Sequence, residues 1–192
     1  MITGKLPTIR VCLLWLTTCV AAWLGMQQVH ELGHVLGAAA TGGRVERVVL
    51  HPLTISRTDV AENRQPLVVV WAGPLIGILL PLVLWMATAL LRLRIAFLLR
   101  FFAGFCLIAN GAYIGGGSFG GIGDCGEMLR HGSPIWLLWL FGLLTVPAGL
   151  VLWNGQGKHF GIGRDAADVD AVAIAASTIA LVLLLTTGLL VG

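Results

Sequence analysis

QQVHELGHVLG, residues 27–37, is a polar segment at the end of an apolar run that begins near Val11. His30, Glu31 and His34 are ionisable groups placed where a membrane span should be finishing. An uncompensated ionisable group near hydrocarbon costs several kcal/mol, so such groups in membrane helices usually mark a function. This stretch therefore predicts a membrane-spanning first helix that carries a functional site near its end.

The composition of the whole chain is typical of a membrane protein. Of its 192 residues, 57% are hydrophobic and 11% are charged, whereas soluble domains average about 45–50% and about 25%. In lipid each backbone polar group must be satisfied within its own segment, which favours helices. The twelve Lys and Arg residues form no basic run or aromatic-interleaved patch, so nucleic acid is excluded as a partner.

Five apolar segments have the length of about 17–25 residues that a bilayer requires. The first covers about Val11 to Val29 and continues as helix to Ala40, and the others are 67–91, 95–114, 135–153 and 172–191. The alternating stretch RVERVVLH, 44–51, predicts a short strand or hairpin beside the membrane. We expect an all-α polytopic membrane protein with about five transmembrane helices and a short membrane-associated strand or hairpin after the first.

No internal repeat is evident, so the chain is interpreted as one membrane domain, 1–192. Its core is 11–130, and 135–192 adds two C-terminal transmembrane helices. Seven Lys and Arg residues fall on one side of the spans and five on the other, which weakly favours a cytoplasmic N-terminus. We expect an integral multi-pass protein of a bacterial-type cell membrane, in contact with the lipid bilayer.

HELGH has the pattern H-E-x-x-H. On a helix, His30 and His34 are one turn apart on the same face, so both imidazoles can reach one metal ion. Glu31 can lie beside the ion without binding it and take a proton from the attacking water. The alternative is a pair of packed histidines with an acid near the helix end.

A catalytic zinc needs a third protein ligand and an open position. Asp124 is the first choice, because it is a hard anionic ligand in a glycine-rich segment, 115–134, that can fold back against the first helix. The alternative is an acid that caps the short helix begun by GEMLR. Cys125 and Glu127 are second choices. The weaker candidates are His51, Asp59, Glu62, His131, His159, Asp165, Asp168 and Asp170.

Three segments together resemble the site-2 protease family of intramembrane zinc metalloproteases. They are HELGHVLGAAATGGRV at 30–45, WAGPLIG at 71–77 and GDCGEMLR at 123–130. They are similar to the family's H-E-x-G-H helix, to the A-G-P motif of its next core helix and to its D-G-G-R segment. The likeness covers roughly 27–130, without a PDZ-like insertion.

The resemblance implies that His30, His34 and Asp124 bind Zn²⁺ and that Glu31 is the catalytic acid–base. In the family, an asparagine about eight residues before the aspartate helps to hold the substrate or the oxyanion. Asn110 is the corresponding candidate, although it lies fourteen residues before Asp124 and no N-x-x-P motif follows. The resemblance also implies that the loops 42–66 and 115–134 face the cytosol near the site.

The expected function is that of an intramembrane zinc metalloprotease that hydrolyses peptide bonds of a membrane protein or peptide substrate. This is proteolysis of the regulated intramembrane type, and the 44–51 stretch could pair with an unwound substrate. Two other classes stay open. One is a catalytically silent relative that acts as a membrane-bound binding or regulatory protein. The other is a small metal or proton transporter, which predicts ionisable groups along several spans.

Overall fold

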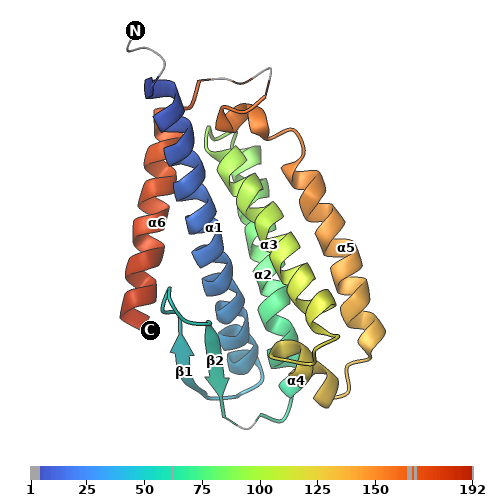
Figure 1. The fold of residues 1–192 in the computed structure, drawn as a ribbon. Helices are drawn as coiled ribbons and strands as arrows, with labels where there is room; N and C mark the ends of the chain where they lie inside the picture. Colours follow the sequence, from blue (N-terminus) through green and yellow to red (C-terminus); the bar gives the residue numbers. More distant parts are fainter. Residues whose placement is uncertain (1–4, 62, 164–165, 167, 192) are drawn as a thin grey trace.

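A helical bundle carries a small hairpin and a short helix at one end (Figure 1). The computed structural model describes residues 5–61, 63–163, 166 and 168–191. In chain order the elements are α1 (Lys5–Ala40), β1 (Val45–Val49), β2 (Arg57–Val60), α2 (Pro66–Leu90), α3 (Ala96–Gly117), α4 (Asp124–Arg130), α5 (Ile135–Trp153), the 3-10 helix η1 (Gly157–Phe160) and α6 (Ala171–Val191). Glu62 and Asp165, two of the candidate third ligands, lie outside the described residues.

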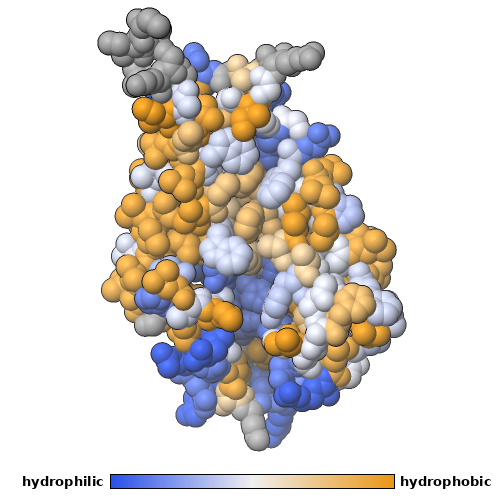
Figure 2. Space-filling view, viewed as in Figure 1, coloured by the Kyte–Doolittle hydropathy of each residue, from blue (hydrophilic) through white to orange (hydrophobic). Residues whose placement is uncertain are grey.

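Five helices of the described chain are long and apolar enough to cross a membrane: residues 8–40 of α1 and all of α2, α3, α5 and α6. This confirms the predicted polytopic all-α architecture. Figure 2 shows hydrophobic residues over the middle of the bundle and hydrophilic residues gathered at the end with the hairpin and α4. The surface therefore has the apolar band that a bilayer requires.

The helix α3 runs past its predicted end at Ile114 to Gly117. Within this extension, Gly115 lets the neighbouring helix α5 come very close. A Cβ on Gly115 would lie 3.1 Å from the Cα of Gly142. The predicted glycine-rich connection 115–134 is consequently shorter than expected, and α4 occupies part of it.

The predicted hairpin after the first helix is present. Its strands β1 and β2 pair antiparallel, with Val45 opposite Val60 and Arg47 opposite Asp59. An irregularity between Val45 and Arg47 interrupts the pairing. The strands lie at the end of α1 (Figure 1), which brings them beside the HELGH segment.

Close approach of α1 and α2 depends on two glycines of α1. A Cβ on Gly33 would overlap the carbonyl oxygen of Ala72, and one on Gly37 would lie 2.7 Å from the Ala72 side chain. Small residues let membrane helices pack backbone to backbone. The C-terminal half of α1 is therefore pressed directly onto the start of α2, where WAGPLIG lies.

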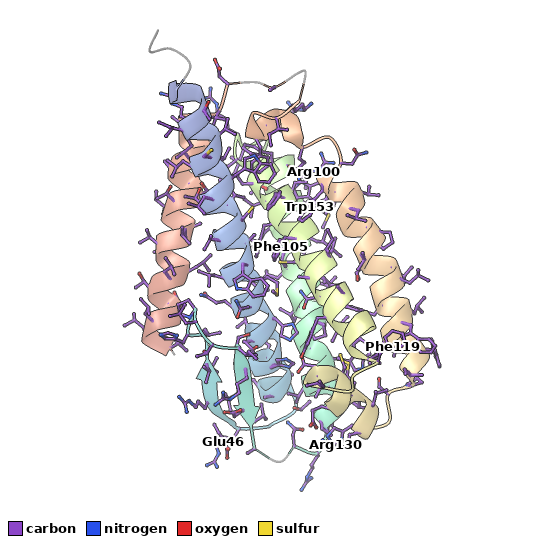
Figure 3. All side chains as sticks on the ribbon, in the orientation of Figure 1. Glu46, Arg100, Phe105, Phe119, Arg130 and Trp153 are labelled. Carbon is purple, nitrogen blue, oxygen red and sulfur yellow. The ribbon has the colours of Figure 1, made fainter. Side chains whose placement is uncertain are left out.

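Aromatic residues close the opposite end of the bundle. The rings of Phe101 and Trp153 stack with centroids 5.1 Å apart, and those of Trp15 and Phe160 lie 4.6 Å apart. Arg100 donates a hydrogen bond to the carbonyl of Asn154 beside this cluster. Figure 3 places Arg100 and Trp153 at this end, far from Glu46 and Arg130 at the other. One end of the bundle is thus packed with aromatic rings, whereas the other end carries the hairpin and α4 (Figure 1).

Candidate metal centre

Ligand atoms of His30, His34 and Asp124 converge on one point, all within 4.8 Å of one another. The Asp124 Oδ2 atom lies 2.8 Å from the Nε2 of His30 and 3.3 Å from that of His34, and the two Nε2 atoms are 3.1 Å apart. Two nitrogens bound at about 2.0–2.1 Å to a tetrahedral zinc would lie roughly 3.3 Å apart. The spacing of the imidazoles therefore fits one small metal ion.

Hydrogen bonds fix which ring nitrogen of each histidine carries its proton. The Nδ1 of His34 is 2.9 Å from the carbonyl oxygen of Val69, so this nitrogen donates. The amide nitrogen of Asn110 donates to the carbonyl of Cys106, which turns the amide oxygen towards the Nδ1 of His30, 2.7 Å away. Because each Nδ1 donates, each Nε2 has its lone pair free for a metal.

The donor set is stable only around positive charge. Two imidazole lone pairs and a carboxylate oxygen repel one another when they face a common point, and His30 and His34 are both only 7% exposed. Extra protons or a metal ion must therefore sit among them. Two nitrogens and one carboxylate oxygen, with room for a fourth ligand, are the donors of a catalytic zinc site.

Residues of α4 bring Asp124 to the histidines. Cys125 and Met128 are completely buried against Ile114 and Leu138, which anchors this short helix. Asp124 is its first residue, and its backbone N–H donates to the Tyr113 hydroxyl. Burial raises the pKa of the Asp124 carboxyl, but its hydrogen bonds and charge interactions with His30 and His34 lower this pKa by more. Asp124 is therefore a carboxylate.

The hairpin positions the carboxylate of Glu31, which is 4% exposed. The hydroxyl of Thr58, on β2, donates to Glu31 Oε2 at 2.8 Å. This contact holds the acid beside the histidines from a segment 27 residues further along the chain. Sequence reasoning missed Thr58, because a single threonine in a short strand carries no signal for this contact.

Glycines of α2 make the room that the site needs. A Cβ on Gly73 would overlap the imidazole of His34, and one on Gly77 would lie 2.9 Å from the amide oxygen of Asn110. In the site-2 protease family, which the sequence resembles, the A-G-P motif often ends in asparagine at the position of Gly77. Here that space is taken by the amide of Asn110 from α3, so WAGPLIG contributes space rather than side chains.

A cavity of about 1540 Å³ contains the site and is lined by His30, Glu31, His34, Asn110 and Asp124, together with residues of α2, α4 and the hairpin. Figure 2 shows hydrophilic residues that extend from the end with the hairpin and α4 towards the middle of the molecule. All four residues of β2 line the cavity, and within the described chain β1 does not. The strand that borders the site is therefore β2, whereas the sequence analysis pointed to the stretch 44–51.

The second-choice ligands point elsewhere. The thiol of Cys125 donates to the carbonyl of Tyr113, and burial raises its pKa to about 11. Glu127 lies on the cavity wall and pairs with Arg130 and His131. The other described candidates are also outside the cluster: His51, Asp59, His131, His159, Asp168 and Asp170.

The chain matches the model of a known protein family. The model of the family described as Peptidase M50B-like matches residues 8–114, more than half of the chain. No curated protein and no solved structure matches the chain. The matched segment contains HELGH, WAGPLIG and Asn110 and ends ten residues before Asp124. With five candidate spans, the chain is an integral multi-pass membrane protein, and it belongs to the Peptidase M50B-like family, as its likeness to the site-2 proteases indicates.

Proposed function

We propose that this protein is a zinc-dependent intramembrane endopeptidase that cleaves peptide bonds of membrane-associated protein substrates. The observation that carries the proposal is the convergence of His30, His34 and Asp124 next to Glu31 in a large cavity. His30, His34 and Asp124 hold the zinc, and Glu31 is the catalytic acid–base. Family membership supports a metallopeptidase of the site-2 type.

A bound zinc supplies Lewis-acid chemistry, which polarises the scissile carbonyl and makes water acidic enough to react near neutral pH. Glu31 accepts a proton from the attacking water as its oxygen bonds to the carbonyl carbon. Glu31 then returns that proton to the leaving nitrogen as the C–N bond breaks. The products are a carboxylic acid and an amine, so one water is consumed for each bond cleaved.

Substrate binding is assigned to the free edge of β2. A peptide can be cleaved only when its scissile carbonyl is accessible, and helical carbonyls are not, because they are hydrogen-bonded within the helix. An extended peptide can pair with a strand edge through main-chain hydrogen bonds. The strand β2 pairs only with β1 in the described chain and borders the cavity, so its other edge is the surface suited to this pairing.

The decisive experiment compares wild type with Glu31→Gln in cells that co-express a single-span membrane protein. Cleavage by wild type only, with full zinc in both forms, is expected. Equal cleavage by both forms would refute the assignment of Glu31. If neither the wild type nor Glu31→Gln cleaved the substrate, the result would favour a catalytically silent binding protein.

Metal analysis of the purified protein tests the ligand set separately. Wild type is expected to contain about one zinc per chain, and His34→Ala and Asp124→Ala are expected to lose it. The matched control is Glu127→Ala, because Glu127 also lines the cavity but pairs with Arg130. Full zinc in the Asp124 variant would remove Asp124 from the ligand set.

A further inference from the structure

We propose that the hydroxyl of Tyr113 is a catalytic hydrogen-bond donor to the oxyanion that forms on the scissile carbonyl. The inference rests on the proposed peptidase function and adds a residue to it. Tyr113 is the chain's only tyrosine, and neither HELGH nor the other two motifs contains it.

The role of oxyanion donor is open because Asn110 is already engaged. Its amide nitrogen donates to the carbonyl of Cys106, 2.9 Å away, and its amide oxygen accepts from His30. The side chain is 1% exposed. The amide oxygen and one of the two amide hydrogens are therefore held by the protein, and the burial of Asn110 leaves the other hydrogen little access to a peptide in the cavity.

Tyr113 is three residues after Asn110 on α3, which puts both on the same side of the helix. Both line the cavity, but Tyr113 is 42% exposed. Its ring lies edge-on to the imidazole of His30, with centroids 5.9 Å apart. The phenol is thus next to a proposed zinc ligand and open to a bound peptide.

The direction of the free hydrogen follows from the contact with Asp124. The backbone N–H of Asp124 donates to the Tyr113 oxygen at 3.1 Å, so this oxygen acts as the acceptor there. Among the described residues no acceptor is recorded for the hydroxyl hydrogen. A phenol that receives one hydrogen bond and donates none within the protein is ready to donate to a ligand in the cavity.

Gly123, the residue before Asp124, leaves the space that this arrangement needs. Gly123 has φ +60°, and a Cβ there would overlap the Tyr113 hydroxyl. The turn that delivers Asp124 to the histidines therefore also leaves room for the phenol oxygen. The proposed ligand and the proposed donor are held in one fixed relation, as preorganised stabilisation of charge requires.

The chemistry gives Tyr113 a role specific to the transition state. As the water oxygen adds to the scissile carbon, the carbonyl oxygen gains negative charge. A hydrogen bond from the phenol is stronger to that oxygen than to the neutral carbonyl, so it lowers the barrier. No proton needs to leave Tyr113, because Glu31 carries the proton from water to the leaving amine.

Tyr113→Phe removes only the hydroxyl and is the test variant. With a cleavable peptide, kcat is expected to fall about 10²–10³-fold, the typical loss for one oxyanion donor. KM and the zinc content at saturating zinc are expected to stay unchanged, and the thermal unfolding temperature is expected to fall only slightly, because the backbone N–H of Asp124 loses its acceptor. A rise in KM with unchanged kcat, or loss of zinc, would instead indicate a structural role and overturn the proposal.

A binding measurement keeps this test independent of cleavage. A phosphonate peptide carries the tetrahedral, negatively charged centre of the transition state. Its affinity for zinc-loaded Tyr113→Phe is expected to fall by a factor similar to that in kcat, while a substrate-like uncleaved peptide binds both forms equally. Equal phosphonate affinity for both forms would refute the role of Tyr113. Failure of the wild type to cleave any peptide, with this affinity difference intact, would count only against the proposed function.

Discussion

The two halves of α1 pack against their neighbours in opposite ways. The N-terminal half uses large side chains, with Leu14 fully buried and Trp15 against the rings of Phe101 and Phe160. In the C-terminal half, the absence of side chains at Gly33 and Gly37 lets α2 approach the backbone of α1. One continuous helix thus has an aromatic end and a glycine-packed end.

This difference shows what polar groups in a membrane helix require. The histidines of the C-terminal half receive partners from three other segments, and such contacts are possible only at short backbone distances. Among the described residues, the aromatic half has no cluster of metal-binding side chains like that of His30, His34 and Asp124, so large aromatic side chains can fill its space. We therefore expect substitutions at the glycine-packed end to affect metal and activity, and those at the aromatic end to affect only stability.

The largest effect is expected from Gly73→Ala. The added methyl would overlap the His34 imidazole, which would have to leave its position. We expect zinc affinity to fall about 100-fold and the free energy of unfolding to fall by about 1–3 kcal/mol. Zinc titration and thermal unfolding measure the two effects. Gly116→Ala is the matched control, because a Cβ there meets no atom within 4 Å; equal zinc affinity in both variants would contradict the packing argument.

Asn110→Ala is expected to come next. It removes the acceptor that orients His30, and loss of such a partner typically costs 10–100-fold in metal affinity. Asn110→Asp retains an oxygen for the Nδ1 of His30 and should retain more of the affinity. Zinc titration of the three forms distinguishes this role from the oxyanion role expected from the family resemblance. If Asn110 instead served the oxyanion, kcat would fall in Asn110→Ala while zinc affinity stayed at the wild-type value.

Thr58→Val is expected to lower kcat about fivefold without loss of zinc. It removes the 2.8 Å hydrogen bond to Glu31, and such a bond contributes about 1 kcal/mol. Thr58→Ser restores the hydroxyl and should restore most of the rate. Peptide cleavage and zinc content are measured on the same preparations. A Ser variant as slow as the Val variant would mean that the hydroxyl does not position Glu31.

The smallest effect is expected at the aromatic end. Thr17→Val removes the 2.7 Å hydrogen bond between Thr17 on α1 and Ser177 on α6. Hydrogen bonds between membrane helices average about 0.6 kcal/mol. Unfolding of Thr17→Val, Ser177→Ala and the double variant should give a coupling of this size. Zinc content should not change, and a change would show that the two halves of α1 are not independent.

The sequence predicted much of this molecule because its strongest signals are local. Runs of apolar residues set the spans, and the predicted ends of 135–153 agree with α5. Helical spacing set the common face of His30 and His34, which the structure brings within 3.1 Å. The position of Asp124, in the segment GDCGEMLR, is harder to predict from local patterns. Asp124 nevertheless lies with the histidines, as the family resemblance implied.

The sequence did not predict which side chains serve the ligands. The contacts of Thr58 with Glu31 and of Asn110 with His30 join residues 27 and 80 positions apart. No periodicity links such positions, because the helices are brought together by packing at Gly33, Gly73 and Gly77. For the same reason the strand at the cavity, β2, and the extension of α3 to Gly117 became evident only in the fold.

The sequence by itself determined a five-span membrane protein with an H-E-x-x-H face on its first helix, since both properties depend on hydropathy and helical period. The tertiary structure alone decided that Val69 and Asn110 orient the imidazoles, that Thr58 holds Glu31 and that Tyr113 faces the cavity. These roles depend on how closely helices approach. That distance is fixed by which neighbouring residues lack a side chain, and not by any one segment.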